Sequence, residues 1–365
     1  MRLGVRAAFV DGDLVPGDVE VAEGSISAVG LAGGGSGLAV PGYVDLQING
    51  FAGVDFLSTD VDGYRKASSA LLSRGVTAFQ PTLITAPKQD VLAAIAVARE
   101  AARIGTGGAR ILGVHLEGPF ISPLRPGAHP VEEIIPPDVK LMRQFLAAGP
   151  ITTVTLAPEL PGALEIADLL VRAGVTVSCG HTNATAAEAN AAFDRGVHTV
   201  THLFNAMRPL AHRDPGIVGA ALAREDVVVQ IVLDHDHLAR ETSLLVWRAA
   251  RGRLCLVSDA IPAAGHGDGV YQLGRIEIRV DGGRARLADG TIAGSTMALD
   301  QAVRNLVDLG SSIEEAVAAV TSVPARVLGR ADIGALRVGA PADVVILDDE
   351  LGVSRVLLAG AEVDL

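Results

Sequence analysis

Four ionisable residues in the middle of the chain each come at the end of a short apolar, β-branched run. They are Glu117, His181, His202 and Asp259. Two imidazoles and a carboxylate suit a borderline divalent ion such as zinc, and they leave a coordination position for water or substrate. The fourth group, Asp259, would then be free to transfer protons. A single histidine after a strand is usually a structural hydrogen-bonder, but four such residues at four strand ends favour a metal site.

Eight strand-like runs, most of them followed by an Ala/Leu-rich stretch with helical spacing, would position these residues. This alternation is typical of a (β/α)8 TIM barrel, in which functional side chains lie at the carboxyl ends of the strands, on one face. A doubly wound open sheet is the competing architecture; it is weakened because Gly-x-Gly-x-x-Gly is missing, although such a sheet need not bind a dinucleotide. The runs are Tyr43–Ile48, Val76–Phe79, Ile111–Leu116, Ile151–Leu156, Val175–Cys179, His198–Thr201, Val227–Leu233 and Leu254–Val257.

The two ends of the chain are also rich in strand-like segments, and tight-turn signals separate them. We therefore predict a small β-sandwich domain that both termini build, with residues 1–40 as its N-terminal part and residues 335–365 as its C-terminal part. Residues 41–334 would form the barrel, with an inserted hairpin at about 271–291. The terminal segments are Arg6–Val10, Asp18–Ala22, Ser25–Val29, Asp343–Leu347 and Val353–Leu358.

The composition excludes several classes of protein. A net charge of −12 argues against a nucleic-acid partner, and any anionic substrate must be met by a local basic patch. The two cysteines, Cys179 and Cys255, lie in apolar runs without a Cys-x-x-Cys pair, which indicates reduced core residues and excludes a thiolate zinc site. No uncharged apolar run reaches the ~18 residues of a membrane span. We expect a cytoplasmic protein.

Several motifs resemble those of the N-acetylglucosamine-6-phosphate deacetylases, which belong to the amidohydrolase superfamily. The resemblance runs in the same order from about residue 41 to the C-terminus, and the motifs together are highly specific. They are Pro41-Gly42-Tyr43-Val44-Asp45-Leu46-Gln47-Ile48-Asn49-Gly50, His115-Leu116-Glu117-Gly118-Pro119-Phe120, Gly180-His181-Thr182-Asn183-Ala184-Thr185, Thr201-His202-Leu203-Phe204-Asn205-Ala206-Met207, Asp214-Pro215-Gly216, Leu256-Val257-Ser258-Asp259-Ala260 and Gly294-Ser295-Thr296.

This resemblance implies a role for each matching residue of the reaction centre. Glu117, His181 and His202 resemble the family's metal ligands, and Asp259 resembles its catalytic aspartate. His129 matches a histidine that contacts the substrate near its carbonyl group.

It also implies a set of substrate-binding residues. Asn205 and Ala206 resemble residues that contact the phosphate, and Arg213 and His237 match basic residues of the phosphate site. In the family the arginine comes from the partner subunit, so a homodimer is implied. Ile292 stands where the family has an aliphatic residue near the acetyl methyl group.

One segment departs from many members of the family. They carry His-x-His after the first strand and hold two metal ions, whereas this chain has Gln47-Ile48-Asn49. Amides are poor ligands for a transition metal compared with imidazole. We therefore predict one divalent ion per subunit, with zinc favoured and iron or another ion as alternatives. Gln47 would at most contact a water in the vestigial second site; ordinary hydrogen bonding at the barrel mouth is the alternative for Gln47 and Asn49.

The implied function is hydrolysis of N-acetyl-D-glucosamine 6-phosphate to D-glucosamine 6-phosphate and acetate. A metal ion lowers the pKa of water from near 16 to about 7, and Asp259 would take a proton from that water and pass it to the departing nitrogen. The alternatives are deacetylation of N-acetylgalactosamine 6-phosphate, another N-acyl amidohydrolase activity, and a catalytically silent barrel that serves as a binding protein.

Overall fold

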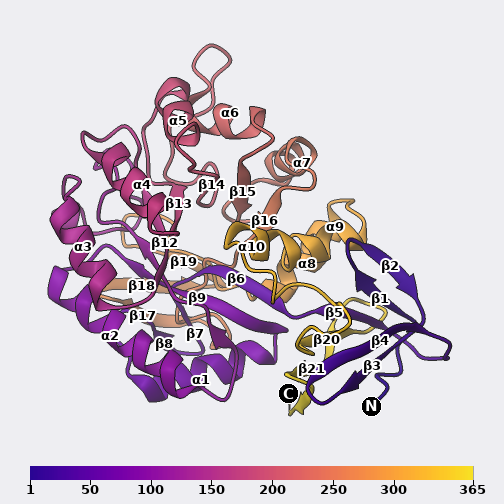
Figure 1. The fold of residues 1–365 in the computed structure, drawn as a ribbon. Helices are drawn as coiled ribbons and strands as arrows, with labels where there is room; N and C mark the ends of the chain where they lie inside the picture. The colour runs from indigo at the N-terminus through magenta and orange to yellow at the C-terminus, as the bar shows by residue number, and fades with distance from the viewer. Residues whose placement is uncertain (365) are drawn as a thin grey trace.

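The computed structural model describes residues 1–364, and its centre is a nearly closed barrel of parallel strands (Figure 1). Every strand pair in it is parallel, and a bridge between Ile48 and Ala260 joins the first strand to the segment after the last. The barrel prediction is therefore confirmed. The strands are β6 (Tyr43–Ile48), β9 (Val76–Ile84), β11 (Val114–Glu117), β12 (Ile151–Leu156), β13 (Thr176–Cys179), β14 (Thr199–Val200), β15 (Val228–Ile231) and β16 (Leu254–Leu256).

Helices cover the outside of the barrel. They are formed by the Ala/Leu-rich stretches between the strands, in which the apolar residues have helical spacing. In α4 the buried residues Ala163, Ile166, Ala167 and Leu170 form one stripe, which faces the sheet. All nine residues of β9 are buried, because a parallel strand is covered on both of its faces. The helices are α1 (Val61–Leu72), α2 (Lys88–Ile104), α3 (Val139–Ala148), α4 (Ala163–Arg172), α5 (Ala186–Phe193), α6 (Gly216–Ala223), α7 (Arg240–Ala249), α8 (Leu299–Asp308), α9 (Ile313–Ala318) and α10 (Ser322–Val327).

Both termini contribute to a second, smaller β domain (Figure 1). Its larger sheet has the order β2-β1-β5-β20-β21-β22, and the β3-β4 pair packs against it over a separate core that includes Val19, Ile26 and Val344. The predicted sandwich is confirmed, while the exact boundaries at residues 40 and 334 remain predictions. Its strands are β1 (Ala7–Val10), β2 (Asp13–Pro16), β3 (Asp18–Ala22), β4 (Ser25–Leu31), β5 (Leu38–Pro41), β20 (Val344–Leu347), β21 (Val353–Leu358) and β22 (Ala361–Val363).

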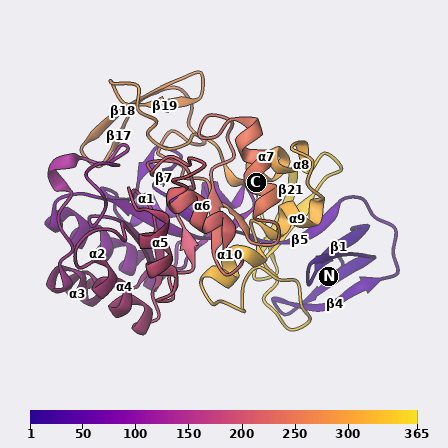
Figure 2. The same cartoon turned by 90° about the horizontal axis from the view of Figure 1, so that it is seen from above.

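The insertion after β16 has one strand more than the predicted hairpin. It is a three-stranded antiparallel sheet of β17 (Gly269–Leu273), β18 (Ile276–Asp281) and β19 (Arg284–Arg286). The extra turn is Gly274-Arg275, and Gly274 adopts a φ of 57° there. Seen from above, this sheet lies on a different side of the barrel from β1 and β4 (Figure 2). No helix in residues 1–364 is long and apolar enough to cross a membrane.

Candidate active site

The four residues at strand ends come together at one mouth of the barrel. Glu117 is the last residue of β11, while His181, His202 and Asp259 follow β13, β14 and β16 within three residues. The last three have positive φ angles of 45°, 27° and 47°. Residues other than glycine rarely adopt this conformation, and such strain clusters at functional sites. Here it turns the chain sharply, so that each side chain lies at the barrel mouth instead of continuing the strand.

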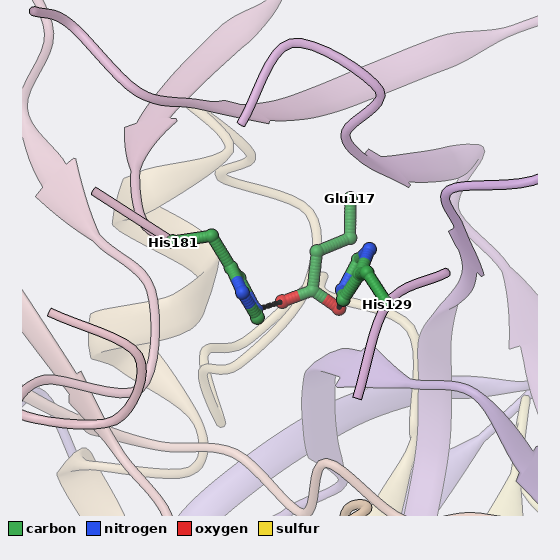
Figure 3. Close-up of side chains that lie close together, drawn as sticks. All are labelled: Glu117, His129 and His181. Carbon is green, nitrogen blue, oxygen red and sulfur yellow. Dashed lines mark ion pairs between the residues drawn. The ribbon is translucent and has the colours of Figure 1, made fainter. Parts of the chain in front are cut away.

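The carboxylate of Glu117 lies at the centre of three imidazoles. Its Oε1 is 2.9 Å from His202 Nε2 and 3.2 Å from His181 Nε2. Its Oε2 is 3.8 Å from His129 Nε2, so the carboxylate lies between the rings of His181 and His129 (Figure 3). Glu117, His129 and His181 each offer a ligand atom, and these atoms lie within 4.8 Å of one another. All four side chains are buried.

Hydrogen bonds on the far side of each ring distinguish His181 from His129. His181 Nδ1 is 3.1 Å from the carbonyl oxygen of Arg125. A carbonyl can only accept, so Nδ1 carries the hydrogen and Nε2 keeps a free lone pair toward Glu117. Ligating histidines usually have this kind of outer partner.

His129 has the opposite arrangement. Its Nδ1 accepts the backbone N–H of Thr85 at 3.3 Å and lies 2.9 Å from Thr85 Oγ1. A neutral ring that accepts at Nδ1 carries its hydrogen on Nε2, the nitrogen that faces the site. The hydrogen bonds therefore favour His129 as a donor and not as a ligand, although it belongs with Glu117 and His181 to the group whose ligand atoms lie within 4.8 Å of one another.

The electrostatics of this group follow from burial and from its internal hydrogen bonds. Burial alone would raise the pKa of Glu117, but the contacts of its carboxylate with the imidazoles of His129, His181 and His202 outweigh burial and hold the pKa well below the usual value. Burial, reinforced by the nearby His129, lowers the pKa of His181 to about 4. For His202 burial acts in the lowering direction, yet the bond to Glu117 prevails and raises the pKa. Glu117 is thus an anion and His181 a neutral base near pH 7.

Two amide side chains orient the fourth residue, Asp259. Asn49 Nδ2 donates to Asp259 Oδ1 at 2.8 Å, and Gln47 Nε2 donates to the same oxygen at 3.2 Å and to Glu117 Oε1 at 2.9 Å. Gln47 therefore bridges the two carboxylates. Burial, followed by the negative charge of Glu117, raises the pKa of Asp259. The second oxygen, Oδ2, accepts neither amide and is the oxygen available for proton transfer.

The donor set fits a single divalent ion. Glu117, His181 and His202 supply one carboxylate and two imidazoles, a combination found in zinc sites that keep one position open. His202 Nδ1, Gln47 Oε1 and Asn49 Oδ1 are buried without a hydrogen-bond partner, so this region holds more polar atoms than its own contacts satisfy. The structure places the amide nitrogen of Gln47 on the two carboxylates of Glu117 and Asp259. The contact of Gln47 with a water in a second site stays a prediction.

A cavity of about 240 Å³ opens beside these residues. Asn205, Ala206, His237 and Ile292, four of the five residues predicted to bind substrate, line it together with His129. Among the described residues that line this cavity there is no lysine or arginine.

The fifth predicted residue, Arg213, is exposed and does not line the cavity of its own chain. It lies in the loop after β14, beside Leu210, which is 48% exposed. The structure therefore separates Arg213 from the other four residues within one chain.

Two residues that the sequence analysis did not single out contact the site directly. Thr85 follows β9 and sets the tautomer of His129. Asp234 lies 2.7 Å from His237 Nδ1 through its Oδ2. Asp234 comes directly after the predicted run Val227–Leu233, which is the same signal that identified Glu117 and Asp259, so the strand-end rule could have found it. Thr85 follows β9 in the structure, but the predicted run ended at Phe79, so the same rule could not have found Thr85.

Comparison with known proteins extends this picture over the whole chain. A model of the amidohydrolase family matches residues 38–363. The N-acetylgalactosamine-6-phosphate deacetylase of Escherichia coli O157:H7 is 36% identical over 364 residues, which cover 97% of each protein. The N-acetylglucosamine-6-phosphate deacetylase of Mus musculus is 40% identical over 344 residues, 89% of this chain and 83% of its own.

A solved structure is equally similar. It is a mutant N-acetyl-D-glucosamine-6-phosphate deacetylase from Mycobacterium smegmatis in complex with N-acetyl-D-glucosamine-6-phosphate. It has a TM-score of 0.94 and 36% sequence identity, and the match covers 100% of this chain and 99% of that one. The similarity therefore includes both domains and the barrel mouth.

Proposed function

This chain belongs to the amidohydrolase family, and we propose that it hydrolyses N-acetyl-D-glucosamine 6-phosphate to D-glucosamine 6-phosphate and acetate. The observation that carries the proposal is the convergence of Glu117, His181, His202 and Asp259 at one barrel mouth, in a chain whose whole length matches sugar-phosphate deacetylases. The enzyme is a hydrolase that acts on an amide bond.

The residues of the site have separate roles in the proposed reaction. A divalent ion held by Glu117, His181 and His202 would polarise the acetamide and lower the pKa of the attacking water. His129 would donate its Nε2 hydrogen to the carbonyl oxygen as negative charge develops there, a contribution of roughly 3 kcal/mol for a well-placed donor. These roles rest on the tautomers inferred from the partners of each Nδ1.

Asp259 would transfer a proton from the attacking water to the sugar nitrogen. Its Oδ2 accepts a proton from the attacking water and then delivers it to the sugar nitrogen, because an amine leaves poorly unless it is protonated. Asn49 and Gln47 hold Oδ1 and so keep Oδ2 toward the cavity. The raised pKa of Asp259, caused first by burial and then by Glu117, suits a group that must both take and return a proton.

The cavity supports an acetylated sugar phosphate as the substrate. Ile84, Leu273 and Ile292 give it an apolar side for the acetyl methyl group. Asn205, Ala206 and His237 would contact the phosphate. We propose that Arg213 completes the phosphate site of the partner subunit in a homodimer, since it is exposed and lies outside the cavity of its own chain.

Two further assignments belong to the proposal. Zinc is the proposed ion because the carboxylate and imidazole donors match its usual ligands. A cytoplasmic location is supported by Cys179 and Cys255, which are both free and buried.

The epimer N-acetylgalactosamine 6-phosphate is the second candidate substrate. The similarity to the E. coli deacetylase of that sugar covers 97% of both chains, which is more than the mouse relative covers. The deciding experiment measures metal content, acetate release and kcat/KM on both phosphorylated sugars with purified protein. A metal-free protein that cleaves the amide at full rate, or no acetate release from either sugar, would refute the proposal.

A further inference from the structure

The loop after β15 holds a carboxylate that the reaction itself does not use. Asp234 Oδ1 accepts the backbone N–H groups of Asp236 and His237, each at 2.9 Å. Its Oδ2 lies 2.7 Å from His237 Nδ1. Burial would raise the pKa of Asp234, but the bonds from His237 outweigh it and hold the pKa well below its usual value. Asp234 is therefore a fixed anion against one edge of the imidazole.

This contact determines how the ring faces the cavity. A carboxylate can only accept, so Nδ1 carries a hydrogen, and Nε2 is the nitrogen on the opposite edge. The side chain of His237 lines the cavity and is only 4% exposed, and its Nε2 is 3.8 Å from Asp259 Oδ2. The distance of 2.7 Å to Asp234 is in the range of charge-assisted hydrogen bonds.

His237 is also the side chain best placed to meet an anion. Among the described residues that line the cavity there is no lysine or arginine, and the other histidines there, His129, His181 and His202, surround Glu117. With Nδ1–H already donated to Asp234, the ring can offer a second N–H from Nε2 only as an imidazolium. The Asp234 carboxylate, 2.7 Å from Nδ1, is the counter-charge that lies against the ring.

We infer that Asp234 is a positioning residue for substrate phosphate: it holds His237 through Nδ1 and supplies a counter-charge on that edge, so that Nε2 faces a phosphate oxygen in the cavity. The inference rests on the proposed function, because it requires a phosphorylated substrate. Asp234 acts through His237 and has no contact of its own with the reacting amide. Its effect should therefore appear in substrate binding and not in the chemical step.

The test compares Asp234→Asn with the wild type on N-acetylglucosamine 6-phosphate and on unphosphorylated N-acetylglucosamine. The amide oxygen of Asn can still accept both backbone N–H groups, but its NH2 group cannot accept the Nδ1 hydrogen of the ring and carries no counter-charge, so we expect KM for the phosphorylated sugar to rise roughly 10-fold. The kcat for that sugar should stay within about 2-fold, and kcat/KM for the unphosphorylated sugar should not change. Asp236→Asn is the matched control, because the Asp236 carboxylate faces Arg286, at 2.9 Å, and not the imidazole.

A double-mutant cycle tests whether Asp234 acts through the ring. His237→Asn should raise the same KM at least as much, and adding Asp234→Asn to it should have no further effect. Additive effects, or an equal loss of kcat on both sugars, would overturn the inference; the second result would assign the Asp234–His237 pair to Asp259 instead. If Asp234→Asn does not fold, Asp234→Ser keeps an acceptor for the turn and gives the same comparison.

The design separates this inference from its premise. If wild-type protein releases no acetate, the proposed function fails. If His237→Asn leaves the preference for the phosphorylated sugar intact, His237 is not in the phosphate site. If His237→Asn lowers that preference and Asp234→Asn does not, only the role of Asp234 is wrong.

Discussion

The reaction centre and the phosphate side of the cavity differ in whether one chain supplies all of their predicted residues. The reaction centre around Glu117 is buried and is built by one chain, which also supplies the carbonyl of Arg125 as a partner for His181. On the phosphate side, His237 is held in the same way by Asp234, but Arg213 is exposed and outside the cavity. Our proposal therefore assigns the chemistry to residues of one chain and part of the phosphate recognition to Arg213 of a second copy.

The largest expected effect lies in the reaction centre. Glu117→Gln should lose the ion and reduce kcat by at least roughly 10⁴-fold, because the pKa of free water is near 16 and not near 7. Metal analysis together with acetate release checks this. A chelator should reduce the wild type to the same level, and added zinc should restore the wild type but not the variant. A variant that keeps one ion per chain would remove Glu117 from the ligand set.

Asp259→Asn should separate proton transfer from metal binding. We expect the ion to be retained and kcat to fall by roughly 10³-fold, within the range of general acid–base catalysis. Metal content and kcat measured on the same preparation decide the matter. Loss of the ion in this variant would make Asp259 a ligand.

Arg213→Ala tests the phosphate side of the cavity. It should raise KM for the phosphorylated sugar roughly 100-fold, since it removes a charge-assisted pair, and leave the unphosphorylated sugar unaffected. Mixed dimers sharpen the test: Arg213→Ala subunits combined with Asp259→Asn subunits should regain activity, because one site then receives an intact arginine and an intact aspartate. Failure of such mixtures to regain activity would place Arg213 outside a shared site.

The sequence predicted the reaction centre better than the contacts that orient it. Glu117 and Asp259 could be found because a strand end in a barrel must point into the mouth, whatever the neighbouring residues are. The bond between Thr85 and His129 joins residues 44 positions apart, and its donor is a backbone N–H, which no side-chain pattern reveals. Arg213 was assigned to the phosphate site by resemblance alone, and the structure of one chain leaves it apart from that site.

Asn49→Ala probes a smaller effect in the reaction centre. It removes the 2.8 Å bond to Asp259 Oδ1, while Gln47 still holds the same oxygen, so kcat should fall only about 10-fold with KM unchanged. The matched control is Gln80→Ala, another buried amide of the barrel, which bonds to Thr152 and Thr153 and not to the carboxylates. Equal losses of kcat in both variants would mean that the amides act only through stability.

The smallest effect on activity should come from Asp45, a buried carboxyl below the mouth. Burial raises its pKa to about 7 in the folded protein from the ordinary value of 3.8, against the hydrogen bonds from Ser258 and Gln47. The folded state therefore binds more protons between these values, so this group's contribution to stability is present below pH 4 and is lost as the pH rises toward 7. Asp45→Asn keeps the shape without the charge. In this variant the free energy of unfolding should decrease less between pH 4 and pH 7 than in the wild type, by up to about 4 kcal/mol. Urea titration at each pH measures this difference. The kcat at pH 7 should change less than 3-fold. An unchanged pH dependence would mean that Asp45 is ionised in the folded barrel at little cost, so that burial at this depth does not by itself hold a carboxyl neutral.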